Sequence, residues 1–152
     1  MRSATTIVLH HWYWTSKNCR QLRQQLDAII DCQKEWFADA LYLDPKDHKY
    51  IDEFGGANFY GITKDGQFQT PKSDSILPSI TKRSILKIAK DLDLDPVETK
   101  IPIEDVDRFA EAGAMGTAAV ISPVGSLTYQ GKKYVFGSET EAGPITQNCM
   151  IL

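Results

Sequence analysis

Short apolar runs, each closed by turn-forming residues, predict β-strands in the first half of the chain. Residues 40–43 form one run, which ends at Asp44-Pro45. Residues 58–63 and 67–70 form two more, separated by Lys64-Asp65-Gly66. An Asp-Gly pair between two strand-forming runs is typical of a tight β-hairpin. We therefore expect strands over all three runs, with the last two paired.

A helical period replaces this pattern after Ser79. Ile85, Ile88, Ala89 and Leu92 follow one another at the spacing that places side chains on one face of a helix. Ser79 is a favourable N-cap residue, because its hydroxyl can accept a hydrogen bond from the first turn. The pattern predicts a helix over 80–92. A broken apolar stripe predicts another helix nearer the N-terminus, formed by Leu22, Leu26, Ile29, Ile30 and Trp36.

The rest of the chain alternates strand and helix signals. We expect a strand over 97–101, a helix from Pro102 to about Ala112, and a hairpin that joins 127–129 to 134–136. Between the last two elements, Gly113 and Gly116 bracket a predicted turn, and Ala119 to Ile121 form a predicted buried strand, closed by Pro123 and Gly125. Hairpins mixed with helices predict an α/β domain with a largely antiparallel or mixed sheet and flanking helices.

Composition narrows the class of protein. The 152 residues, 42% hydrophobic and 24% charged, fit one ordinary soluble domain. A net charge of −3 with interspersed signs argues against a nucleic-acid or membrane-binding surface, and no apolar stretch reaches transmembrane length. Three cysteines without paired spacing argue against a disulfide framework or a zinc site, and fit a reducing cytoplasm.

Two stretches are candidates for chemistry. In the predicted turn that begins at Gly113, small residues let backbone N–H groups approach an anion, and Thr117 adds a hydroxyl donor beside Ala118. The alternative is a plain connection between a loop and a strand. Residues 10–14, His-His-Trp-Tyr-Trp, suggest metal or stacking chemistry, or else an irregular segment with exposed aromatic side chains.

Three motifs occur together at a characteristic spacing. They are Asp52-Glu53-Phe54-Gly55-Gly56-Ala57-Asn58-Phe59-Tyr60, then Thr70-Pro71 followed by Ile76-Leu77-Pro78-Ser79-Ile80-Thr81, and the run from Gly113 to Val124. Together they resemble the branched-chain aminotransferases, which are pyridoxal-phosphate enzymes of fold type IV. The resemblance implies the fold of the D-amino-acid-aminotransferase-like enzymes.

The resemblance also implies a domain organisation. It runs from about Leu26 to Thr146 and corresponds to the larger, C-terminal domain of that family. We therefore expect an irregular segment unlike the family over 1–25, the aminotransferase class IV domain over 26–146, and an altered tail over 147–152. The family's smaller N-terminal domain has no counterpart in this sequence.

The resemblance assigns roles to five residues. Glu53 takes the position of the carboxylate that keeps the cofactor's ring nitrogen protonated. Ile80 and Thr81 open the predicted helix at the family's phosphate-binding positions, and Thr117 closes this site from the other side. The amides of Thr117 and Ala118 match those that receive the substrate carboxylate. The alternatives are a solvated carboxylate, a simple helix start and a simple turn.

The family also needs a lysine that binds the cofactor covalently and shuttles a proton. Counting back from Glu53 places Lys17 at or within a residue of that position, but Asn18 to Leu22 do not match the family's Thr-Ala-Gly-Asn-Tyr. Codons allowed for residues 10–25, read one nucleotide later, can spell the family's lysine segment. Codons for residues 147–152, read two nucleotides later, can spell its C-terminal helix. We hypothesise a frameshift at both ends, through mutation or sequencing error, which the coding DNA would test.

The resemblance implies a cytoplasmic, pyridoxal 5'-phosphate-dependent transaminase that acts in branched-chain amino acid metabolism. It would exchange the amino group between leucine, isoleucine or valine and 2-oxoglutarate, as a homodimer. Because the small domain and the intact lysine segment are missing, we expect little activity from this chain alone. One alternative is another fold-type-IV enzyme, such as a D-amino-acid aminotransferase or an aminodeoxychorismate lyase. The other is a non-catalytic remnant domain.

Overall fold

A computed structural model of the chain describes residues 4–9, 39–76, 78–117, 120–137 and 141–151. The predicted helix over 22–36, the aromatic and histidine cluster at 10–14, Lys17 and Ala118 lie outside the described residues. None of the described helices is long and apolar enough to cross a membrane.

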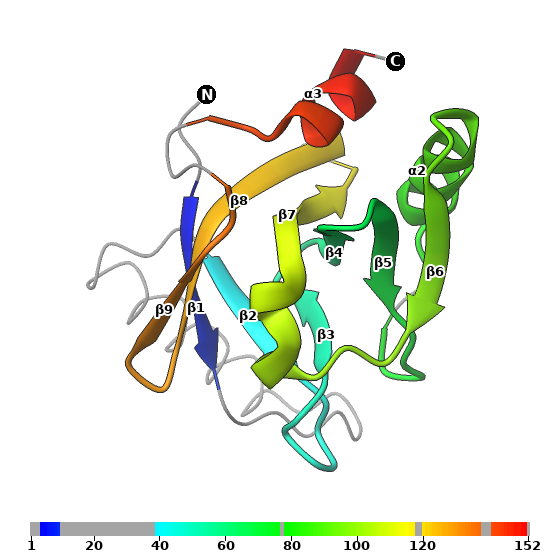
Figure 1. The fold of residues 1–152 in the computed structure, drawn as a ribbon. Coiled ribbons are helices and arrows are strands. Elements are labelled where there is room, and N and C mark those ends of the chain that lie inside the picture. Colours follow the sequence, from blue (N-terminus) through cyan, green and yellow to red (C-terminus); the bar gives the residue numbers. More distant parts are fainter. Residues whose placement is uncertain (1–3, 10–38, 77, 118–119, 138–140, 152) are drawn as a thin grey trace.

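The described strands form one nine-stranded mixed sheet (Figure 1). Strand β1 is parallel to β2 and to β8, and β5 is parallel to β6, while the other pairs are antiparallel. The expected mixed sheet is therefore confirmed. The strands are β1 (Ala4–Leu9), β2 (Asp39–Leu43), β3 (Ile51–Phe54), β4 (Asn58–Thr63), β5 (Gln67–Pro71), β6 (Asp95–Thr99), β7 (Phe109–Gly116), β8 (Val120–Tyr129) and β9 (Lys132–Val135).

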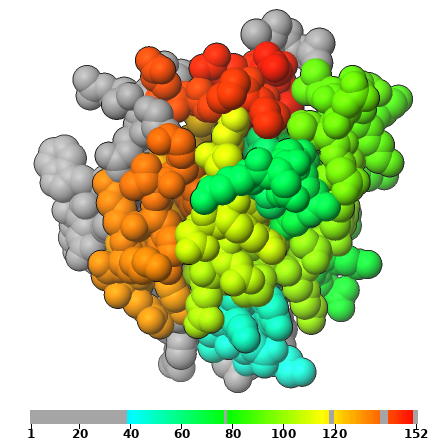
Figure 2. Space-filling view, in the orientation of Figure 1, coloured from blue at the N-terminus to red at the C-terminus, as the bar shows by residue number. Residues whose placement is uncertain are grey.

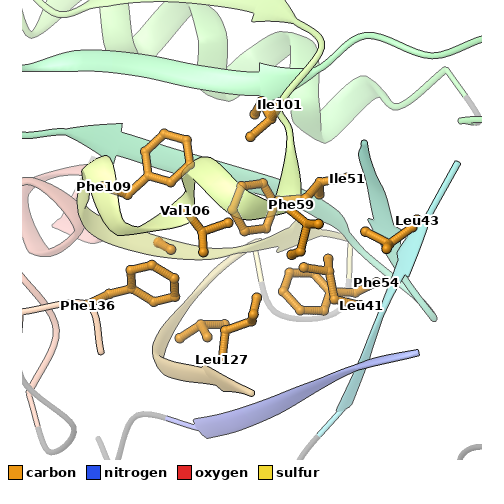
Figure 3. Packing of buried hydrophobic residues seen from close by; sticks show 13 residues of the cluster. Leu41, Leu43, Ile51, Phe54, Phe59, Ile101, Val106, Phe109, Leu127 and Phe136 are labelled. Carbon is orange, nitrogen blue, oxygen red and sulfur yellow. The ribbon is translucent and has the colours of Figure 1, made fainter. Parts of the chain in front are cut away.

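The sheet closes on itself. Its strands follow the order β3-β2-β1-β8-β7-β4-β5-β6, and β3 also pairs with β4. The first six of these strands therefore form a ring, with β5, β6 and β9 attached outside it. One apolar cluster draws most of its side chains from ring strands and from the short 3-10 helix η1 (Ile103–Arg108), and Ile101 and Phe136 from segments between elements complete it. Figure 3 shows its centre, where the Phe59 ring lies 6.0 Å from the rings of Phe54 and Phe109.

Two helices cover a second apolar cluster on the other face of β4, β5 and β7. Helix α2 (Ile80–Asp91) lies alongside β6 and contributes Ile85 and Ala89, while α3 (Pro144–Ile151) lies across the end of β8 and contributes Cys149 (Figure 1). In Figure 2, α3 (red) reaches the green residues of α2 across the top of the molecule. The predicted helix over 80–92 is thus confirmed, with its apolar face turned to the sheet.

Local turn chemistry explains the elements that the sequence predicted well. The hydroxyl of Ser79 accepts a hydrogen bond from the Lys82 amide at 3.1 Å, as an N-cap does. Gly66 turns the β4–β5 hairpin at a φ of 88°. The β8–β9 hairpin turns at Gln130 and Gly131, with φ values of 49° and 77°. Positive φ at both central residues matches the twist of the flanking strands.

The helix predicted from Pro102 to about Ala112 is wrong beyond Arg108. The 3-10 helix occupies 103–108, and the chain then extends into β7, which pairs with β4 on one side and β8 on the other. Ala110, Glu111 and Ala112 favour helices intrinsically. Pairing along both edges of β7 outweighs that preference, since each edge supplies a ladder of backbone hydrogen bonds.

The turn and strand predicted within 113–125 also need correction. Gly113 and Gly116 lie inside β7, so the turn comes later, and Thr117 begins it. Val120 opens β8 as an exposed residue, and Pro123 and Gly125 lie within the strand and do not close it. Pro123 is paired there with Gly113 of β7.

Three further strands differ from the sequence prediction. The segment over 1–25 was expected to be irregular, but Ala4–Leu9 form strand β1, which pairs in parallel with β2 and β8. The strand predicted over 97–101 lies two residues earlier, at Asp95–Thr99. Ile101 is instead a buried residue whose carbonyl accepts a hydrogen bond from the Ile51 amide at 2.8 Å. Strand β3 was not predicted, because its four residues Ile-Asp-Glu-Phe carry two charges and no clear alternation.

Candidate active site

Three distant parts of the chain surround a recess of about 410 Å³. Its walls are the β3–β4 turn, the start of α2 and the end of β7. The lining residues are 53–58, 78–80 and 115–117. The structure thus brings together Glu53, Ile80 and Thr117, which the sequence singled out separately.

The β3–β4 turn gives the recess its shape. Phe54 and Ala57 close the turn through a 2.8 Å hydrogen bond from the Phe54 amide to the Ala57 carbonyl, and Gly55 and Gly56 form its exposed tip. The end of β7 packs tightly against this turn. A Cβ added to Gly116 would lie 3.3 Å from both the Gly56 carbonyl oxygen and the Ala57 Cβ. The absence of a side chain at residue 116 therefore lets the two walls meet.

Glu53 is the only charged residue among the described residues that line the recess. It pairs with Asn58 across the β3–β4 ladder, and the Asn58 side-chain amide donates a hydrogen bond to Glu53 Oε2 at 3.3 Å. Burial raises the pKa of Glu53 to about 7, and the negative charge of Asp52 adds to this effect while the Lys82 ammonium opposes it. At neutral pH the carboxyl group is therefore close to half protonated.

The raised pKa predicts a pH-dependent stability. Because the pKa of Glu53 is about 7 in the folded chain against an ordinary 4.5, the folded state holds the proton more tightly than the unfolded state. The free energy of unfolding therefore falls as the pH rises from about 4.5 to 7, by about 1–2 kcal/mol once solvent screening is allowed for. Glu53→Gln should remove this part of the fall. Denaturant titrations across that range would measure it, and an unchanged pH profile in the variant would contradict the assignment.

The start of α2 offers the recess free backbone donors. The amides of Ile80 and Thr81 have no intrahelical acceptor, because they lie in the first turn. The first turn contains no acidic residue, so the positive end of the helix dipole is not neutralised there. Ile80 lines the recess with its side chain exposed, whereas Thr81 is half-buried next to it and is not among the lining residues.

Thr117 is the first residue after β7 and is exposed at the rim of the recess. Thr117 was predicted to help bind an anion, and it does lie at the recess. The turn that contains it follows β7, whereas the prediction placed the turn at Gly113 to Gly116, which lie inside β7. Ala118 and Lys17 lie outside the described residues.

The sequence prediction missed two residues of the recess. Asn58 holds the Glu53 carboxylate, and Met115, which is fully buried, lines the recess beside Gly116. The position of Asn58 could have been inferred from the sequence. A hairpin closed by Gly55-Gly56 places residue 58 opposite residue 53, but the missing β3 prediction concealed this pairing.

Comparison with known proteins identifies the class that this fold and site define. The family model for amino-transferase class IV matches residues 9–127. The chain therefore belongs to the class IV aminotransferase family.

Individual relatives narrow the comparison within that family. The chain is 61% identical over 127 residues to a branched-chain-amino-acid aminotransferase of Haemophilus influenzae, a match that covers 83% of this chain and 37% of the relative. It is 46% identical over 104 residues to a branched-chain-amino-acid aminotransferase of Helicobacter pylori, covering 68% of this chain and 31% of that protein. The chain thus spans roughly a third of the length of these curated relatives.

Solved structures share the fold. The branched-chain amino acid aminotransferase from Escherichia coli superimposes with a TM-score of 0.78 at 26% identity, over 97% of this chain and 50% of the other. The branched-chain amino acid aminotransferase from Thermobaculum terrenum, in its PLP-form, gives a TM-score of 0.77 at 24% identity, over 97% of this chain and 48% of the other. The expected fold, that of fold-type-IV aminotransferases, is confirmed.

Proposed function

We propose that this chain is the large domain of a branched-chain amino acid aminotransferase that binds pyridoxal 5'-phosphate in the recess. One observation carries the proposal: a carboxyl group with a raised pKa and the free N-terminus of a helix line the same small recess. The relative from Haemophilus influenzae, a branched-chain-amino-acid aminotransferase at 61% identity, supports the substrate class.

The residues of the recess fit this cofactor. Bound pyridoxal phosphate supplies an electron sink that stabilises negative charge next to the amino group of a substrate. Its phosphate would accept hydrogen bonds from the amides of Ile80 and Thr81, where the helix dipole favours an anion. The hydroxyl of Thr117 would contact the phosphate from the opposite wall.

Glu53 would hold the proton on the ring nitrogen. Alone, its carboxyl group titrates near neutral pH, because burial disfavours the charged form. A cationic ring N–H beside Glu53 would favour the carboxylate, which then accepts the hydrogen bond. The Asn58 amide fixes one carboxyl oxygen by donating to Oε2. A cation that enters the recess would therefore lower the pKa of Glu53 and ionise its carboxyl group.

The remaining roles complete the proposal. Lys17 would bind the cofactor covalently and move the proton, and the amides of Thr117 and Ala118 would receive the substrate carboxylate. The substrates would be branched-chain amino acids and 2-oxo acids, handled by a homodimer in the cytoplasm. The domain would span 26–146, between the segment at 1–25 and the tail at 147–152. Little transaminase activity is expected from this chain alone.

A charge placed at the start of α2 tests the proposed phosphate site. Ile80→Glu would add a negative charge at the helix N-terminus and should weaken pyridoxal phosphate binding by about 10-fold. Val135→Glu is the matched control, because Val135 is also an exposed apolar residue but lies on β9. Spectroscopic titration of both variants and the parent chain would measure the affinities. Equal affinities in all three proteins would contradict the site.

Borohydride reduction and peptide mapping of the loaded chain test the proposed lysine. A single adduct at Lys17 would support its role and would justify assays with branched-chain amino acids. Scattered labelling would show that Lys17 does not act as proposed. A parent chain that binds no pyridoxal phosphate would contradict the proposed function itself.

A further inference from the structure

The connection between β5 and α2 leads to the helix start that lines the recess. A buried carboxylate accepts a hydrogen bond from this segment. The hydroxyl of Ser75 donates a 2.6 Å hydrogen bond to Oδ2 of Asp52, which is only 5% exposed on β3. Ser73 supports this contact, because its hydroxyl lies 2.6 Å from that of Ser75. Among the described residues of 73–78, the bond from Ser75 to Asp52 is the hydrogen bond whose partner lies outside the connection.

A buried lysine, Lys82, links the two ends of the same connection, where α2 begins and β5 ends. Lys82, in the first turn of α2, is 9% exposed. Its ammonium group donates to the carbonyl of Pro71 at 3.1 Å and lies 3.4 Å from Oε2 of Glu98. Pro71 ends β5 and Glu98 lies on β6, so Lys82 joins the helix start to both strands.

The Asp52 carboxylate is held at some cost to stability. Its Oδ1 atom is buried and has no hydrogen-bond partner among the described residues. A buried carboxylate oxygen without a partner destabilises the folded state. Asp52 is therefore poorly explained as a residue that only stabilises the fold, and its hydrogen bond to Ser75 links it to the connection that leads to the recess.

We propose that Asp52 and Lys82 are positioning residues, which fix the N-terminus of α2 at a set distance from Glu53 by holding the two ends of the β5–α2 connection. This inference rests on the proposed function, because the distance matters only if one molecule contacts both Glu53 and α2. Neither residue is among those that line the recess, so the positioning is transmitted by the bonds of Asp52 to Ser75 and of Lys82 to Pro71.

The same two residues act on Glu53 through their charges, in opposite directions. The negative charge of Asp52, next to Glu53 on β3, raises the pKa of Glu53, and the positive charge of Lys82 on α2 lowers it. The lining residues from β4 and β7 carry no charge, and Asn58 is the neutral partner of the Glu53 carboxyl group. Asp52→Asn should thus bring the pKa of Glu53 below about 7, and Lys82→Met should raise it.

The titration of Glu53 can be measured without any ligand, by carboxyl carbon NMR of the full chain. Asp52→Asn and Lys82→Met should shift the midpoint in opposite directions. Asp74→Asn and Lys87→Met are matched controls, because they remove the same charges at exposed positions on the connection and on α2. A variant that merely loosened the fold would not give shifts of opposite sign, so equal midpoints or shifts of the same sign would overturn the charge effect.

Binding tests the positioning. Ser75→Ala and Lys82→Met should each weaken pyridoxal phosphate binding by about 5- to 10-fold, the worth of one lost hydrogen bond. Lys82→Arg retains a donor for the Pro71 carbonyl and should restore most of the affinity. If the parent chain binds the cofactor and both variants bind equally well, the positioning inference fails while the proposed function stands. If the parent chain does not bind, the proposed function fails and the positioning inference with it.

Discussion

Replacing Gly113 with alanine is expected to lower the free energy of unfolding by about 3 kcal/mol or more, because the atoms that the added methyl group would overlap cannot move aside without breaking other contacts. Gly113 lies in the middle of β7, paired with Tyr60 on β4 and Pro123 on β8. A Cβ at this position would lie 2.5 Å from the carbonyl oxygen of Ser122 and would overlap the Tyr60 ring and hydroxyl.

Neither neighbour of Gly113 can move away cheaply. The Tyr60 ring is stacked on Phe68 at a centroid distance of 5.2 Å, and its hydroxyl is hydrogen-bonded to Thr146 Oγ1 at 3.1 Å. Ser122 belongs to the backbone of β8, which is paired with β7 along this stretch. Relief of the overlap would therefore break a strand pair or the stacked aromatic pair.

Denaturant unfolding would measure the effect of Gly113→Ala. Gly56→Ala is the control, because a Cβ on Gly56 would have no atom within 4 Å. Its stability should change by no more than about 1 kcal/mol. If both variants lost the same stability, the effect would come from glycine's backbone freedom and not from crowding inside the sheet.

Replacing Glu111 with alanine is expected to cost about 3 kcal/mol and to release α3 from the sheet. The buried carboxylate of Glu111 accepts hydrogen bonds from the amides of Ile145 at 3.1 Å and Thr146 at 2.8 Å, in the first turn of the helix. Those amides would otherwise have no intrahelical acceptor. Gly143 shows how closely this carboxylate fits, because a Cβ there would overlap the Glu111 side chain.

Hydrogen exchange of the α3 amides would show the release directly. In the parent chain these amides should be protected, and in Glu111→Ala they should exchange much faster than the amides of β7 and β8. Glu104→Ala is the control, since Glu104 is exposed on η1. A uniform loss of protection over the whole sheet would contradict a local role for Glu111.

The elements that the sequence predicted correctly are those whose signals are local. Asp65-Gly66 and Gln130-Gly131 determine hairpins through their own backbone preferences. Ser79 and the spacing of Ile85 and Ala89 determine α2 through capping and one buried face. In each of these cases, the cause lies within a few residues of the element.

The sequence prediction is wrong where contacts between residues far apart in the chain determine the secondary structure. Residues 109–112 favour a helix by composition, but β4 and β8 extend them into a strand. Glu111 has the sequence context of a solvated helix residue, yet its carboxylate meets amides about thirty-five residues further along the chain. Strand β3 forms because β2 and β4 pair with it, not because of any period within its four residues.

The candidate site was predictable in part. The resemblance singled out Glu53, Ile80 and Thr117, and the structure places all three around one recess. The hydrogen bonds that hold the surrounding segments were not predictable from the sequence. The bonds of Asp52 to Ser75 and of Lys82 to Pro71 connect residues whose spacing follows no motif.

The closed ring has a consequence for biosynthesis. Strand β1 (Ala4–Leu9) lies between β2 and β8 in the sheet, and β8 (Val120–Tyr129) follows it far along the sequence. An emerging chain therefore carries an open strand edge on β1 until β8 has also left the ribosome. Ring closure becomes a late, cooperative step, because contacts of such long range are the slowest to form. Nascent chains released before β8 should expose that edge and associate with one another.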